Sequence, residues 1–496
     1  MSRTSFHVIN AGLVMLLASA GAAAGAVAGT GVHGKCLGTQ VVATNAPVPA
    51  DPYPLMAAGW GPELGKGLMA SRWAEDWSGM AAAGRAPALK AIPLGSGATL
   101  ALSGEARLRY VTSGNAQLSR GNDIQQGQFR GTLGADLRIN PNVRVYGELG
   151  TGHVDEHRDT ATANFQNVVS LQQLFVDVRE HVGSALVGAM VGRQEFSDGP
   201  RQLVSLSDGP NLHRSWNGIR AYVHGERQRF GAFDLRATRL QRGAFDEEIN
   251  SGERLQGVNA SFVVSPADGP NTYLEPFWIH SENPAFRIGG RAGLDDRNTF
   301  GARLWGRRGK FRFDWVAARQ TGRSIDNRRV DAWGVFAVQS LDLGDGGWKP
   351  RLTSHVDIAS GARAYGSGTL AAFNPLYASS NYLGEGQFLG LSNLLLIAPG
   401  LAMSPTPKTT LSFEYGYARR LEEHDVAYAG GMRAYAGTQA VPGHRLGGLF
   451  RLAGSWAATT RLTVSLNYEQ FDAGEVLERA GFYSGSYGYF NATYRY

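Results

Sequence analysis

The sequence predicts an all-β fold, a transmembrane antiparallel β-barrel of about 18 strands, and three observations lead to this prediction. First, polarity alternates with a period of two residues along many segments, as in residues 98–114 (ATLALSGEARLRYVTSG). Second, the chain has 66 glycines and 10% aromatic residues, and no apolar run reaches the roughly 18 residues that a membrane helix needs. Third, the connections between alternating segments are short and long in turn.

Residues 1–26 have the layout of a secretory signal peptide. Arg3 precedes an apolar run through Leu17, which is followed by the small residues Ala18-Ser19-Ala20. The apolar core is too short to span a membrane as a helix. The single cysteine, Cys36, follows a lysine where a lipid anchor would need a small residue, so we interpret it as a lone thiol that forms no internal disulfide.

Residues 27–97 show no alternation and contain the proline-rich stretches APVPADPYP and GRAPALKAIP. We predict a periplasmic N-terminal extension, either packed lightly against the mouth of the barrel or serving only as a linker.

The barrel itself is expected over residues 98–496. Strand boundaries from a sequence are uncertain by a few residues, and a missed pair would change the count to about 16 or about 20. An even count places both ends of the barrel on the periplasmic side. The expected strands are 100–111, 127–138, 142–151, 169–179, 184–193, 213–224, 231–240, 255–265, 272–280, 297–306, 310–319, 331–343, 351–359, 388–398, 408–420, 446–456, 461–470 and 487–496.

The connections between these strands fall into two classes. The even ones are tight, such as INP, EHVG, RRG and LGDGGWKP, whereas the odd ones include long stretches such as 194–212 and 360–387. A secreted β protein with a dry core, the alternative fold, has no reason to sort its connections in this way. An outer-membrane barrel does, because it has short periplasmic turns and long extracellular loops. The predicted location is therefore the bacterial outer membrane, after export.

The alternation also predicts which face of each strand is wet. An arginine on the lipid face near the membrane centre costs about 2–4 kcal/mol, so the charged face must line the lumen. Arg107 and Arg109 are therefore expected inside, and Leu108 and Tyr110 against lipid.

The same rule extends to the other strands. The expected lumen cations are Arg107, Arg109, Arg138, Arg144, Arg220, Arg236, Arg303 and Arg312, and the expected lumen carboxylates are Asp136, Asp177, Asp234 and Asp314. In the strand at 231–240 this sets Phe233 and Leu235 outside. The chain has 48 lysines and arginines, of which only six are lysines. Arginine's planar fork grips carboxylates in pairs, so a surplus of lumen arginine predicts a strip that draws anions. The alternative is that these charges pair across strands and only brace the wall.

The last strand, GYFNATYRY, ends on the aromatic Tyr496. This ending resembles the sorting signal that the barrel-assembly machinery reads, so we expect that machinery as a partner.

Two motif pairs carry a family resemblance. They are VGRQEFSDGPRQL with NLHRSWNGIRAYV over 191–223, and FNPLYASSNYLGEGQFLGLSNLLLIAPGLAMSP over 373–405. The sequence resembles the alginate export family of outer-membrane proteins, in which a GRQ segment, an Arg-Ser-aromatic-x-Gly strand, an FNPL segment and GLSNL occur in this order. The resemblance runs from about residue 98 to the end of the chain.

The resemblance implies a monomeric barrel whose arginine-lined pore passes an anionic exopolysaccharide outward. By position, Arg193, Arg214 and Arg220 join the pore cations, and the FNPL residues serve loop architecture. Implied partners are the acidic polysaccharide, outer-membrane lipid and lipopolysaccharide, and periplasmic scaffold proteins of polysaccharide biosynthesis. An outer-membrane diffusion porin that takes up small acidic sugars or other anions remains the alternative.

One feature departs from the family. Its members have a long late periplasmic turn that covers the pore as a lid, but here residues 457–460 leave almost no chain between two strands. Gating then falls to residues 27–97 and the long outside loops, or this member has no lid.

No catalytic or cofactor site is expected. Thr353, His355 and Asp357 share one strand face without a nucleophile, which predicts a hydrogen-bonded lumen cluster rather than an enzyme. Basic residues gather in no surface stripe, so no nucleic-acid partner is expected. Three acidic clusters in predicted outside loops are read as solvated charge, with weak Ca²⁺ binding as the alternative. They are Glu247-Glu248, Asp295-Asp296 and EEHD at 422–425.

Overall fold

The computed structural model describes residues 65–156, 161–266, 271–344 and 346–496. The predicted signal peptide, Cys36 and the first part of the predicted extension lie outside the described residues.

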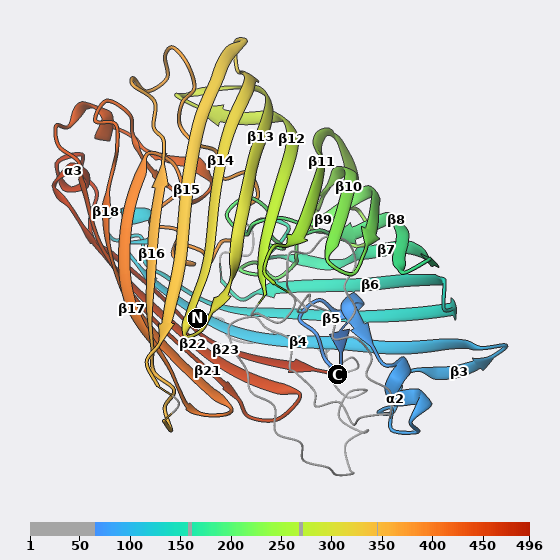
Figure 1. The fold of residues 1–496 in the computed structure, drawn as a ribbon. Helices are drawn as coiled ribbons and strands as arrows, with labels where there is room; N and C mark the ends of the chain where they lie inside the picture. The colour runs from blue at the N-terminus through green and yellow to red at the C-terminus, as the bar shows by residue number, and fades with distance from the viewer. Residues whose placement is uncertain (1–64, 157–160, 267–270, 345) are drawn as a thin grey trace, which may run out of the picture.

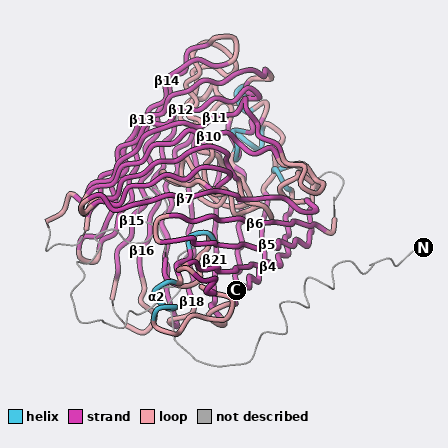
Figure 2. The backbone as a smooth tube through the Cα atoms, turned by 90° about the vertical axis from the view of Figure 1, so that its right-hand side faces the viewer, coloured by secondary structure: helices cyan, strands magenta, loops and turns pink. Residues whose placement is uncertain are grey.

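Eighteen antiparallel strands close into a barrel, in which each strand pairs with the next and β23 pairs with β4 to seal the ring (Figures 1 and 2). The predicted fold class is therefore confirmed. The strands are β4 (Ala98–Gly114), β5 (Ile124–Asn140), β6 (Val143–Val154), β7 (Asn167–Val182), β8 (Ala185–Glu195), β9 (Ser215–His224), β10 (Gln228–Arg239), β11 (Glu248–Val263), β12 (Thr272–Ile288), β13 (Arg291–Arg308), β14 (Phe311–Ser324), β15 (Arg328–Asp342), β16 (Arg351–Ala359), β17 (Leu394–Thr406), β18 (Thr409–Arg419), β21 (Arg445–Ala457), β22 (Leu462–Ala473) and β23 (Gly485–Arg495).

Short elements precede the ring and decorate its loops. β3 pairs with the first residues of β4 beside the ring. In the described part of the chain, no helix is long and apolar enough to cross a membrane. These elements are β1 (Gly65–Lys66), η1 (Arg72–Ala74), β2 (Glu75–Asp76), α2 (Ser78–Ala82), β3 (Ile92–Gly95), η2 (Ala116–Leu118), β19 (Ala427–Ala429), η3 (Gly430–Met432), β20 (Arg433–Tyr435), η4 (Thr438–Ala440) and α3 (Glu475–Arg479).

The connections sort by end of the barrel, as predicted. The end that carries Tyr496 has the turns 141–142, 183–184, 225–227, 264–271, 309–310, 343–350, 407–408 and 458–461. The other end carries the connections 115–123, 155–166, 196–214, 240–247, 289–290, 325–327, 360–393, 420–444 and 474–484.

Two of the expected outside loops are instead paired strand. The predicted loops 281–296 and 320–330 extend β12 to β15 far past the predicted ends, with pairs such as Phe286 with Gly293 and Arg323 with Arg329. Pro284, Gly289 and Gly290 resemble loop signals in the sequence, whereas in the structure Phe286, Ile288 and Val330 are buried on the inner face. The β12–β13 hairpin closes on Gly289 and Gly290 at φ +61° and +75°, a conformation that favours glycine and suits the tightest hairpins.

β17 begins later than predicted. The expected strand 388–398 is observed as Leu394–Thr406, because the apolar stretch before it belongs to a loop in the core and the chain continues as strand through Pro399 and Gly400. Pro399 is the register partner of Ser354 on β16, but toward β18 it falls between the pairs Ile397–Tyr417 and Gly400–Glu414 and is unpaired on that side.

The side-chain faces of β4 agree with the prediction. Leu108 and Tyr110 are 62% and 51% exposed, whereas Arg107 is 1% exposed. Similar exposed apolar side chains surround the ring, and we call them the outer belt. It includes Leu108, Tyr110, Leu133, Leu149, Leu174, Val176, Val191, Ile219, Val223, Phe230, Val258, Leu274, Phe300, Trp315, Trp333, Val335, Ile397, Phe413, Tyr415, Leu466, Tyr468 and Phe490.

The loop end of the lumen is filled by a hydrophobic core. Side chains of the loops 196–214, 360–393 and 420–444 pack there against inward residues of β9 to β12, β14 to β18, β21 and β22. The loop side chains include Phe196, Leu203, Phe373, Phe388, Leu389 and Ala429.

This core reverses the predicted faces of β10. Phe233 and Leu235 point inward into the core, so Asp234 and Arg236 face outward, and their predicted lumen orientation is wrong. Asp234 lies opposite Ile219 of β9, which is 46% exposed. The rule that the charged face lines the lumen assumes a wet lumen, and on this side the lumen is dry.

Candidate functional site

Three arginines of β4 and β5 form a cluster beneath the loops, which we call the arginine cluster: Arg107, Arg109 and Arg130. Arg107 and Arg130 lie directly opposite each other on paired strands. The side chains of Arg107, Arg109 and Arg130 are only 1%, 4% and 3% exposed, respectively. Because like charges at opposed positions destabilise a sheet, this cluster needs anionic or carbonyl acceptors.

Two long loops supply the acceptors. Arg107 donates to the backbone oxygens of Asp208 at 2.8 Å and Pro210 at 2.7 Å. Arg109 donates to the backbone oxygen of Gly209 at 3.0 Å and to Glu385 Oε2 at 2.9 Å. The arginines therefore hold the loops 196–214 and 360–393 inside the lumen.

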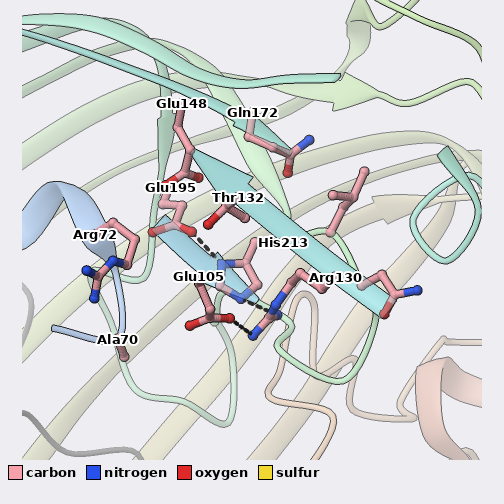
Figure 3. A pocket seen from close by; sticks show the side chains of 11 residues that line it. Ala70, Arg72, Glu105, Arg130, Thr132, Glu148, Gln172, Glu195 and His213 are labelled. Carbon is pink, nitrogen blue, oxygen red and sulfur yellow. Dashed lines mark hydrogen bonds and ion pairs between the residues drawn. The ribbon is translucent and has the colours of Figure 1, made fainter. Parts of the chain in front are cut away.

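Arg130 extends this contact to a network of mostly buried side chains (Figure 3), although Asp208 is 59% exposed. Its guanidinium lies 2.6 Å from Glu105 Oε1 and 2.7 Å from Asp208 Oδ1. His213 places Nδ1 2.5 Å from Glu195 Oε1 and Nε2 2.9 Å from the same Asp208 oxygen. Nη1 of Arg130 also lies 2.9 Å from His213 Nε2, a like-charge contact that Asp208 offsets.

The charge of His213 follows from these neighbours. Burial alone would lower the pKa of His213, but the carboxylates of Glu195 and Asp208 outweigh it and raise the pKa from 6.5 to about 9. His213 is therefore a cation at neutral pH and strengthens the hold on the loop to which it belongs.

A small polar pocket lies within this network. Cationic, anionic and amide side chains all face it, so it suits a polar solute better than an apolar one. Its lining residues are Ala70, Arg72, Glu105, Arg130, Thr132, Glu148, Gln172, Glu195, Asn211, Leu212 and His213.

The chain before the barrel contacts the network from the end of the barrel that carries Tyr496. We call Arg72–Asp76 the plug segment. Trp73 donates from Nε1 to Glu195 Oε2 at 3.0 Å and packs edge-on against Phe175 with ring centroids 6.3 Å apart. Arg72 donates to the backbone oxygen of Tyr496 at 2.5 Å. The plug segment thus joins the C-terminal strand to the lumen network.

Three predicted lumen cations contact this plug segment. Arg138 pairs with Asp76 at 2.7 Å. The guanidiniums of Arg144 and Arg220 lie 6.0 Å and 5.5 Å from the ring centroid of Trp73. The predicted carboxylates Asp136 and Asp177 lie 3.5 Å and 4.0 Å from Arg144 Nε.

Other predicted cations lie elsewhere in the lumen. Arg303 makes a two-pronged contact with Asp314, at 2.7 Å and 2.8 Å. Arg312 pairs with Asp342 at 3.0 Å, with 39% of its side chain exposed. Arg214, in a loop, stacks on Tyr377 at 4.8 Å. Whether any of these residues touches substrate stays a prediction.

Arg193 does not face the lumen. Met190 of β8 is fully buried inside, so alternation turns Arg193 outward, opposite Leu174, which is 49% exposed. Arg193 pairs there with Glu247 at 2.9 Å. The lumen orientation implied by the family motif is therefore wrong for this residue, as it is for Arg236 and Asp234 on β10.

One carboxylate of each acidic cluster is less solvated than predicted, whereas Glu248 and Asp296 are 54% and 49% exposed. The side chain of Glu247 is 5% exposed in its pair with Arg193. Asp295 lies in β13 and binds Arg297 at 3.0 Å with 2% exposure. Asp425 is fully buried and accepts from the backbone N–H of Ala362 at 2.7 Å, and burial raises its pKa to about 6. These carboxylates are shielded from water because strands or loops that the sequence did not predict pack around them.

The His355–Asp357 pair is a hydrogen-bonded cluster. His355 Nδ1 lies 2.9 Å from Asp357, which also accepts from the Tyr382 hydroxyl at 2.6 Å. Among the described residues, no group of three or more His, Cys, Asp or Glu is placed to hold a metal ion.

Sequence reasoning missed several members of the network. The parity that set Asp136 and Arg138 inward also sets Arg130 inward, so Arg130 was within reach. His213, Glu195 and Glu385 gave no signal, because their contacts join segments far apart in the chain.

Comparison with known proteins identifies the family to which this barrel belongs. The model of the alginate export family matches residues 98–489, which include almost the whole ring. The chain belongs to the alginate export family. It is therefore an outer-membrane barrel of a channel family rather than of an enzyme family. Among curated proteins, no relative matches the sequence.

Solved outer-membrane proteins share the fold of this alginate export family member. Pseudomonas aeruginosa OccK5 (OpdH) has a TM-score of 0.52 at 11% identity over 80% of this chain and 97% of its own. Acinetobacter baumannii OccAB4 has a TM-score of 0.55 at 7% identity over 81% and 98%. Pseudomonas aeruginosa OccK2 (OpdF), solved in complex with glucuronate, has a TM-score of 0.51 at 12% identity over 80% and 96%.

Proposed function

We propose that this outer-membrane pore passively exports an anionic, uronic-acid-bearing exopolysaccharide through the arginine cluster. The observation that carries the proposal is that Arg107 and Arg109, buried on the lumen wall, are held by carboxylate and carbonyl oxygens of the long loops rather than by the wall alone.

The chemistry of exchange supports this assignment. An incoming carboxylate can replace the loop oxygens that bind a guanidinium. Each hydrogen bond that the arginine loses to the loop is then formed again with the polymer. Conduction needs binding that is favourable on entry and weak enough for release, and the loop oxygens compete in just that way. Glu385 is the clearest internal competitor, since it pairs with Arg109 at 2.9 Å.

On the periplasmic side, an arginine is also paired with a carboxylate of the chain itself. Arg138 is paired with Asp76 of the plug segment at 2.7 Å, so a chain carboxylate again occupies a lumen arginine. A uronate arriving from the periplasm would meet this pair before the arginine cluster. Because the barrel holds no energy source, we expect periplasmic scaffold proteins of polysaccharide biosynthesis to deliver the polymer.

Uptake of small acidic sugars is the second candidate. The arginine, carboxylate and amide side chains that face the pocket suit the polar groups of a sugar acid, and this lining favours uptake. In that case the solute would bind the pocket and the polymer would not.

Planar-bilayer recordings separate the two functions. The reversal potential under a salt gradient is measured first, then block by polymannuronate, by a neutral glucan of equal length and by monomeric glucuronate. Export predicts anion preference and block by polymannuronate alone, whereas block by glucuronate alone would assign uptake.

The variant Arg107→Gln with Arg109→Gln is the direct test of the site. We expect the polymer affinity to fall by at least about a hundredfold, since the variant removes two charge-assisted hydrogen bonds of about 1.5–3 kcal/mol each. Arg239→Gln is the matched control, because Arg239 is 61% exposed and pairs with Glu248. Unchanged block and selectivity in the double variant would refute the proposed role of the cluster.

A further inference from the structure

The outer face of β14 and β15 carries three arginines, which we call the arginine patch: Arg319, Arg323 and Arg329. They share this face with Trp315 and Trp333, which are 40% and 43% exposed. Alternate residues of the same strands point the other way and are buried, so the patch faces away from the lumen.

The charges of the patch are not balanced within it. Arg323 and Arg329 lie directly opposite each other on the paired strands, an arrangement that destabilises a sheet when both residues are cationic. A single carboxylate, Asp331, serves two of the arginines, at 2.8 Å from Arg319 and 3.5 Å from Arg329. Arg323 donates to the backbone oxygen of Asn327 at 3.2 Å.

The next strand does not remove the surplus. Asp296 of β13 is the register partner of Arg323, is 49% exposed and lies 3.8 Å from His280 Nδ1. Even if Asp296 is counted with Asp331, the three arginines leave the patch positive. An additional anion would therefore stabilise it.

The height of the patch on the barrel identifies what lies beside it. Arg319 is in register with Phe300 and Trp333, two aromatic residues of the outer belt. Arg323 is four residues further along β14, about 13 Å at the rise of a strand. The β14–β15 turn is on the loop end, opposite Tyr496. The patch therefore spans the step from apolar belt to headgroup layer on the extracellular side.

We propose that the arginine patch binds the phosphate groups of the outer-leaflet glycolipid, lipid A, while the acyl chains cover Phe300 and Trp333. Phosphate matches the guanidinium fork, and one phosphate can bridge two arginines that otherwise repel each other. The exposure of Arg319 and Arg329, 62% and 68%, leaves their guanidiniums open to a lipid beside the wall.

Native mass spectrometry of the full chain in detergent tests this site. The protein is titrated with bisphosphorylated lipid A, with lipid A stripped of both phosphates, and with phosphatidylethanolamine. We expect tight retention of bisphosphorylated lipid A only. In Arg319→Gln/Arg323→Gln/Arg329→Gln, we expect its affinity to fall by at least about tenfold, the effect of removing one charge-assisted hydrogen bond.

The control removes two other exposed arginines, Arg239→Gln and Arg291→Gln. Each pairs with one carboxylate, Glu248 at 2.5 Å and Asp326 at 2.7 Å, and we expect this variant to bind like wild type. The single variant Arg323→Gln serves if the triple variant does not give the heat-modifiable band of a folded barrel.

Three outcomes would overturn the proposal. They are equal retention of lipid A by the patch variant, equal affinity for the dephosphorylated lipid, and displacement of lipid A by excess inorganic phosphate. The last result would make the patch a general anion site rather than a lipid site.

Discussion

His213 is a charged side chain in the lumen network. It lies between Glu195 and Asp208 and carries a charge because they raise its pKa to about 9. A group whose pKa is raised on folding stabilises the folded state fully below its unfolded pKa, here 6.5, and loses that contribution as the pH rises through the folded value.

We therefore predict that the loop 196–214 loosens as the pH rises through about 9. Single-channel recordings between about pH 7 and about pH 10, values that bracket the shifted pKa, should show a rising open probability. His213→Gln should have no such rise over this range, because it has no proton to lose. An equal rise in His213→Gln would assign the effect to another group.

Single residues also show where sequence reasoning holds and fails. Leu108 and Arg107 follow the alternation rule, because lipid faces one and protein the other. Asp234 and Arg236 violate it, because apolar loops fill the lumen on the opposite face of their strand. The contact of His213 with Glu195 depends on a loop conformation that no local pattern encodes.

Among the elements, the plug segment gives the clearest prediction. Trp73 fills the space between Arg144 and Arg220 and donates to Glu195. Trp73→Ala removes these contacts and should raise the open probability in planar bilayers at neutral pH.

Trp348→Ala provides the control for this substitution. Trp348 is 60% exposed in the periplasmic turn 343–350, so its removal leaves the lumen network intact. If both variants conduct like wild type, the plug segment does not limit the opening of the pore.

Strand ends were the least predictable elements. β12 to β15 run past the predicted strand ends, where Pro284 and Gly289-Gly290 resemble loop signals although Phe286 and Ile288 are buried inside. β17 passes through Pro399, which sequence reasoning treats as a break. In contrast, the short turn 458–461 and the long loop 360–393 were evident from spacing alone.

For the whole molecule, the outer belt fixes the position in the membrane. Leu108, 62% exposed on β4, is expected to lie in the hydrocarbon layer. Leu108→Arg should lower the free energy of unfolding in a phospholipid bilayer by about 2–4 kcal/mol, as measured by urea titration.

Leu94→Arg is the matched control for the outer belt. Leu94 is 54% exposed but lies on β3, outside the ring of strands. We expect it to change the free energy of unfolding by less than about 0.5 kcal/mol. A similar loss of stability in both variants would contradict the assigned belt.

The number of strands and the sorting of their connections could be predicted from the sequence, because each strand must present one apolar face to the lipid. The filling of the lumen did not follow. It depends on how the loops 196–214 and 360–393 fold back over the wall, and on the arginine cluster that holds them there.

The packed loop core has a consequence for the cell. A barrel of eighteen strands with a bare lumen would admit detergents and antibiotics as readily as nutrients. Here Phe196, Phe373 and Phe388 pack in the loop core at the loop end of the lumen, with side chains that are at most 2% exposed. A bacterium can therefore contain many copies of this protein without an increase in outer-membrane permeability. Its sensitivity to drugs should increase only while a solute passes through the pore.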